Sequence, residues 1–186
     1  RVRIPGTDAA PNQLKGWESD GLDPHTWQRS VPILEREATR GRPCFVVSKR
    51  LYAGTGFTEA ILRGGTFVAG DTVTDRVEIG ADLAARNPGA LVYVYTPELD
   101  TIGHASGWES DAWAAALERV DDAARVLEGA LPRDVGAVVT ADHGMVDVPR
   151  HRQLLLGEGD VLLDSVRIVA GEPRMLHLYA DEPDPV

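Results

Sequence analysis

The chain has 186 residues, of which 43% are hydrophobic, and it carries a formal net charge of −10. The acidic balance argues against binding to nucleic-acid backbones, and the absence of any long apolar run argues against a membrane span. The length suits one α/β domain, so we expect residues 1–186 to form a single domain with an irregular segment at 1–30 and a tail at 181–186.

The first elements alternate between helix and strand. Residues 1–30 contain many prolines and glycines and show no periodicity. Ser30 resembles a helix cap, and the helix that it begins should end before the buried strand 44–48. A short helix is predicted at 57–62 within a connecting loop, and a longer one over 71–86, where the apolar residues fall on one face. This rhythm is typical of α/β proteins.

Residues 90–148 form the central unit of the chain. The segments 91–95 and 137–140 are rich in β-branched and aromatic residues, so each predicts a fully buried strand. The helix predicted at 110–129 lies between them, and such a crossover favours two parallel, neighbouring strands. Strands at 161–170 and 174–179 should then form a hairpin with a longer turn. The whole pattern predicts an α/β fold, with a mostly parallel central sheet, helices on both faces and a C-terminal β-hairpin.

Asp and His side chains follow both strands of the central unit. Asp100 and His104 come after the first strand, and Asp142 and His143 come directly after the second. Taken alone, Asp100 and His104 are better explained by a capped turn and a surface histidine, and Asp142 and His143 alone are ambiguous, because Asp is common in caps and turns. Because parallel strands end at the same edge of a sheet, the two pairs together indicate a metal site. Gly144 would let the backbone pass close to such a site.

The ligand types favour zinc, with manganese or another divalent transition metal as alternatives, and they argue against calcium. Four protein ligands can close one tetrahedral site, or they can be divided between two metals about 3.5–4 Å apart. His177 alternates within a predicted strand and is interpreted as structural. His25 and His151 lie in loops, and no role is assigned to them.

The motifs TPELDTIGH and VVTADHGMVDV, separated by a helix, resemble the alkaline phosphatase superfamily, specifically its type I phosphodiesterase/nucleotide pyrophosphatase branch. The resemblance implies two zinc ions at the carboxyl edge of the sheet, one bound by Asp100 and His104, the other by Asp142 and His143. It also implies hydrolysis of a small phosphodiester or nucleotide, with a metal-activated threonine as nucleophile and a covalent phospho-enzyme.

The family pattern extends beyond these residues. The nucleophilic threonine, a further aspartate ligand and a third histidine have no match here, so no catalytic residue is assigned within the chain. We therefore expect a central portion of an alkaline-phosphatase-like domain, inactive alone, whose open sheet edge favours a homo-oligomer. No leader pattern is present, and a cytoplasmic location is expected. Two alternatives stay open: a phosphomonoesterase or sulfatase of the same superfamily, and a metal-binding piece without catalysis.

Overall fold

The computed structural model describes residues 1–180 apart from 15, 18 and 158, so the expected tail at 181–186 lies outside the described residues. The chain divides into two compact units. Residues 28–54 and 58–147 form the first, here called the sheet unit. Residues 1–27, 55–57 and those from 148 onward form the second, here called the hairpin unit. Each is described by itself.

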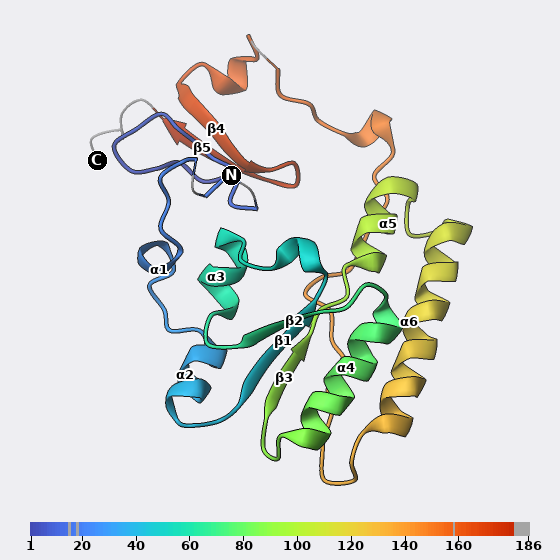
Figure 1. Ribbon diagram of the computed structural model, residues 1–186. Helices are drawn as coiled ribbons and strands as arrows, with labels where there is room; N and C mark the ends of the chain where they lie inside the picture. The colour runs from blue at the N-terminus through green and yellow to red at the C-terminus, as the bar shows by residue number, and fades with distance from the viewer. Residues whose placement is uncertain (15, 18, 158, 181–186) are drawn as a thin grey trace. The chain divides into compact units, whose positions relative to one another are not determined.

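The sheet unit contains three parallel strands in the order β2-β1-β3 (Figure 1). They are β1 (Cys44–Ser48), β2 (Thr66–Ala69) and β3 (Leu91–Val94). Strand β1 has a hydrogen-bonded neighbour on each side, and its Val46 and Val47 are 0% exposed. A nearly continuous apolar run, here residues 44–47, is typical of a strand covered on both faces.

Helices flank this sheet, as the sequence predicted: α2 (Ile33–Thr39), α3 (Gly56–Leu62), α4 (Val73–Arg86), α5 (Glu98–Ser106) and α6 (Asp111–Ala130). Thr72 and Asp75 form a capping box that begins α4. Two apolar clusters join helices to strands. One gathers around Leu34 and Val46, and the other gathers around Val77 and Ala123.

Several boundaries differ from the prediction. Pro32, rather than Ser30, occupies the N-cap position of helix α2, and no side chain caps the helix there. Strand β2 was not anticipated, because four residues give too short a pattern to recognise. Helix α5 replaces the loop expected after the first strand of the central unit. Strand β3 is half-buried rather than fully buried, since it lies at one end of the described sheet and Tyr93 is exposed.

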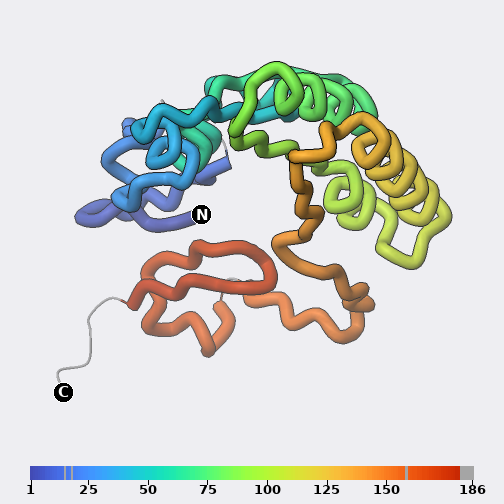
Figure 2. The backbone as a smooth tube through the Cα atoms, turned by 90° about the horizontal axis from the view of Figure 1, so that it is seen from below, coloured from blue at the N-terminus to red at the C-terminus, as the bar shows by residue number. Residues whose placement is uncertain are grey.

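The predicted strand at 137–140 is wrong in this structure. After α6 the chain follows an extended path, visible in Figure 2, with no strand assigned between residues 131 and 148. Val138 is 91% exposed and Val139 is 76% exposed. A β-branched run becomes a stable strand only when a neighbour supplies hydrogen bonds and burial. This segment has the local preference for a strand but no ladder partner among the described residues.

The hairpin unit contains a separate antiparallel sheet of β4 (Val166–Glu172) and β5 (Met175–Ala180). Glu172 pairs with Met175, so the loop has two residues and is shorter than predicted. Residues Val161–Leu163 form a 3-10 helix instead of the start of the strand. In the irregular segment before the sheet, Trp17 is buried and packs edge-on against Trp27 of α1 (Pro24–Trp27), with ring centroids 6.2 Å apart.

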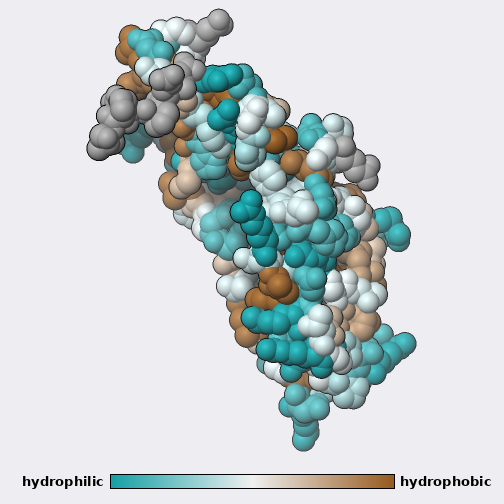
Figure 3. Space-filling view, turned by 90° about the vertical axis from the view of Figure 1, so that its left-hand side faces the viewer, coloured by the Kyte–Doolittle hydropathy of each residue, from teal (hydrophilic) through white to brown (hydrophobic). Residues whose placement is uncertain are grey.

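The surface view in Figure 3 shows polar side chains interspersed with scattered apolar ones on the face that it displays. Within the described residues, no helix combines the length and apolar character needed to cross a membrane.

Candidate functional site

Helix α5 presents Asp100 and His104 on one face. Pro97 begins the helix and Gly107, with φ of 83°, ends it. Residues four apart lie one turn above each other on the same face of a helix. The Asp100 Oδ1 and His104 Nε2 atoms are accordingly 3.3 Å apart, and both side chains are about half exposed. The first predicted pair is therefore assembled by local helical geometry alone.

Asp142 and His143 approach this pair from the extended segment after α6. His143 Nε2 lies 3.8 Å from Asp100 Oδ1 and 3.8 Å from Asp142 Oδ2. The other ring nitrogen, Nδ1, lies 2.9 Å from the carbonyl oxygen of Gly144. His143 lies more than forty positions after Asp100 in the chain, and the fold thus brings it next to the carboxylate of Asp100.

The structure brings Asp100 next to both histidines, whereas the only one of the other three that Asp142 is seen to contact is its neighbour His143. Across the described residues, no group of three or more His, Cys, Asp or Glu side chains is spaced to hold a metal ion. The arrangement is therefore the Asp100–His104 pair and the Asp142–His143 pair, linked by the approach of His143 to Asp100. Asp142, with its side chain 91% exposed, is the least constrained of the four.

A buried charge network, absent from the sequence analysis, holds the start of α5. Arg76 is 0% exposed on α4, and its Nη2 donates a hydrogen bond of 2.6 Å to Glu98 Oε1. Arg76 Nη1 donates to the carbonyl oxygens of Gly70 and Asp71 at 3.1 Å. Lys49 Nζ lies 3.1 Å from the same Glu98 oxygen.

The protonation of Glu98 reflects this network. Burial alone raises the pKa of Glu98, but the hydrogen bonds from Arg76 and Lys49 outweigh burial and hold the pKa below its ordinary value. The charged form of Glu98, two residues before Asp100, is therefore stabilised where α5 begins. The sequence does contain a signal for this network. Arg76 falls on the apolar face of its helix with Val73 and Val77, and a charge in such a stripe indicates a buried partner.

Two tyrosines of the site, Tyr93 and Tyr95, lie near the aspartates, and Tyr52 packs against Tyr95. The rings of Tyr93 and Tyr95 stack 6.5 Å apart, and Tyr52 meets Tyr95 edge-on at 6.0 Å. The pKa of Tyr95 is raised first by burial, then by Tyr52, and further by the charges of Asp100 and Asp142. Burial and the Asp142 charge raise the pKa of Tyr93 in the same way. The site is therefore locally anionic, a condition that favours a bound cation.

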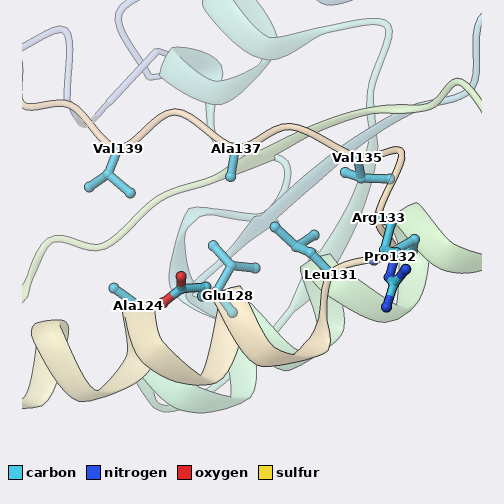
Figure 4. Close-up of a pocket in the computed structure, with 9 residues that line it drawn as sticks. Ala124, Glu128, Leu131, Pro132, Arg133, Val135, Ala137 and Val139 are labelled. Carbon is cyan, nitrogen blue, oxygen red and sulfur yellow. The ribbon is translucent and has the colours of Figure 1, made fainter.

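Thr58 belongs to the sheet unit and makes a contact of its own. The hydroxyl of Thr58 is nearly buried and donates a 2.7 Å hydrogen bond to the carbonyl oxygen of Tyr52. Thr7, Thr55, His25, His151 and His177 belong to the hairpin unit. A pocket with a volume of about 460 Å³ lies between the end of α6 and residues 135–139, and Figure 4 shows the residues that line it. None of the four predicted residues lines that cavity.

Comparison with protein families gives a match to the model described as type I phosphodiesterase/nucleotide pyrophosphatase, over residues 17–184. Searches of curated proteins and of solved structures give no significant match. The family match covers nearly the whole chain and includes both Asp/His pairs. The chain thus belongs to the type I phosphodiesterase/nucleotide pyrophosphatase family, a family of hydrolases within the alkaline phosphatase superfamily.

Proposed function

We propose that this protein is a metal-dependent hydrolase of phosphodiester or pyrophosphate bonds, and that Asp100, His104, Asp142 and His143 hold two zinc ions. The observation that carries the proposal is the position of Asp100, whose Oδ1 lies 3.3 Å from His104 and 3.8 Å from His143. Family membership supplies the reaction class. The natural substrate we propose is a small phosphodiester or nucleotide.

The donor set suits zinc. Asp and His ligands bind zinc through one oxygen or nitrogen each, at about 2.0–2.2 Å, so two ligands of a tetrahedral ion lie about 3.3 Å apart. The Asp100–His104 separation of 3.3 Å matches this spacing. We assign Asp100 and His104 to one ion, and Asp142 and His143 to the other. Burial is the main cause that raises the pKa of Tyr95, and the charges of Asp100 and Asp142 add to it, so a cation bound beside these carboxylates would offset negative charge. Another divalent transition metal would fit the same donors.

Zinc ions bound here would supply Lewis acidity that polarises the phosphoryl group and lowers the pKa of a bound hydroxyl. The chain's own residues hold the ligand side chains in position. Helix α5 holds Asp100 and His104 at a constant spacing, and the Lys49–Glu98–Arg76 network fixes the helix start. The contact of His143 Nδ1 with the Gly144 carbonyl favours the tautomer that leaves Nε2 free as a ligand.

We propose that the nucleophile is a threonine that is not among the 186 residues of this chain. Within the sheet unit, the Thr58 hydroxyl is engaged with the Tyr52 carbonyl and is nearly buried, which makes it unsuited to attack a substrate. The 186-residue chain alone is then expected to bind metal without turning over substrate.

Calorimetric titration with zinc tests the proposal directly, with elemental analysis of the purified chain to give the stoichiometry. We expect zinc binding that His143→Ala weakens by at least about 10-fold, because an imidazole ligand is lost. His177→Ala is the matched control, since His177 is exposed on β5 and belongs to the hairpin unit. Equal zinc affinity in the chain and in His143→Ala would refute the assignment of His143 as a ligand.

A further inference from the structure

The segment that carries Asp142 and His143 contains one residue that is not exposed. From residue 136 to residue 150 every side chain is on the surface except Met145, which is partly buried. No helix or strand is assigned from 136 to 149, so backbone hydrogen bonding does not fix the position of this segment. Its placement on α5 therefore depends on side-chain contacts, and Met145 is the apolar one.

Met145 packs against the backbone of α5 at Gly103, which is buried. A Cβ atom built on Gly103 would overlap the Met145 sulfur and would lie 2.6 Å from its Cε. The same Cβ would lie 3.4 Å from Cδ1 of Trp113 on α6. The end of the methionine side chain thus occupies the space that any residue larger than glycine would fill. A flexible, polarisable thioether suits such a shallow seat beside an indole.

Trp113 forms the other side of the space that Met145 occupies, and it is hydrogen-bonded to α5. Its indole Nε1 donates a 3.1 Å hydrogen bond to the carbonyl oxygen of Leu99. This bond fixes the indole against the first turn of α5, next to Asp100. A second approach lies one turn further along, where a Cβ on Gly107 would meet Asp147 Oδ1 at 3.3 Å. Two glycines four residues apart therefore face two side chains of the incoming segment.

We infer that Met145, seated on Gly103 beside Trp113, is a positioning residue that holds the Asp142–His143 pair within reach of Asp100. Met145 is two residues after His143, and Gly103 lies between Asp100 and His104 in the chain. The contact thus lies within three residues of both ligand pairs in the chain. The consequence for metal binding rests on the proposed function, whereas the packing contact does not.

The contact can be observed by NMR, because the chain has two methionines. Labelling the methionine methyl groups with ¹³C gives one signal from Met145 and an internal reference from Met175, which is 65% exposed on β5. We expect a nuclear Overhauser effect between the Met145 methyl and the Trp113 indole in the unmodified chain. Gly103→Ala should abolish it and increase the backbone mobility of residues 141–147, leaving the Met175 signal unchanged.

Gly129→Ala is the matched control. Gly129 is also a helical glycine, on α6, and a Cβ there meets nothing within 4 Å. Zinc titration of the same samples should show a loss of affinity of at least about 10-fold in Gly103→Ala and Met145→Ser, and none in Gly129→Ala. Met145→Leu should retain the affinity, because leucine has a similar volume and can occupy the same seat.

The inference is overturned if the Met145 methyl shows no contact with Trp113, or if Gly103→Ala leaves that contact and the mobility of 141–147 unchanged. It is also overturned if Gly103→Ala and Gly129→Ala lose zinc affinity equally. A chain that binds no zinc would contradict the proposed function instead. In that case the methyl contact and its loss in Gly103→Ala would still decide the role of Met145.

Discussion

Helix α5 and the segment 136–147 each contribute one aspartate and one histidine to the candidate site, and they are held in different ways. Helix α5 is a regular element whose first turn is bonded to the buried Arg76 and whose Asp100–His104 spacing follows from the helix itself. The segment has no regular structure, exposes its valines and meets α5 through His143, Met145 and Asp147. One half of the site is therefore preorganised by the fold, while the other depends on a few contacts.

The largest expected effect of this difference is on zinc binding by the two aspartates. Asp100→Asn should weaken the binding of both zinc ions, because the Asp100 carboxylate is next to both histidines. The affinity of the more tightly bound ion should fall by more than about 100-fold. Asp142→Asn should weaken the binding of one ion only, since Asp142 is paired with His143 alone. Calorimetric titration measures both affinities. Identical losses in the two variants would show that the carboxylate of Asp100 is not shared.

The second prediction concerns the anchor of α5. Arg76→Met should lower the free energy of unfolding by about 3 kcal/mol, because it leaves Glu98 with one cation fewer in a partly buried place. Urea unfolding followed by circular dichroism measures the change. Arg125→Met on the exposed face of α6 is the control, with an expected change within about 0.5 kcal/mol. A loss as small as that of the control would mean that the network contributes no stability to α5.

The third prediction compares two valines of equal size. Val46→Ala in β1 should cost about 2 kcal/mol of unfolding free energy, because Val46 is 0% exposed. Val138→Ala should change the unfolding free energy by less than about 0.5 kcal/mol, since Val138 is 91% exposed. Thermal unfolding of the two variants checks both values. If Val138→Ala costs as much as Val46→Ala, residues 137–140 are buried in solution and the segment is a paired strand.

Local patterns predicted most of the fold because they depend on short-range physics. The apolar face of 71–86 predicted α4, and the helix expected at 110–129 matches α6, each to within two residues of the observed ends. A buried β-branched run predicted β1. The same reasoning failed at 137–140, where the composition favours a strand but the pairing and burial that stabilise one come from other parts of a sheet.

The sequence by itself determined the four candidate ligands, since their residue types and their places after two apolar runs are visible in the chain. It also determined the family, through the motifs that contain them. Only the tertiary structure decided which of the four meets which, because a 3.8 Å approach of His143 to Asp100 depends on how a segment lies on a helix. The Arg76–Glu98 bond and the Met145 contact were decided in the same way, since side chains far apart in sequence become partners only after the helices have packed.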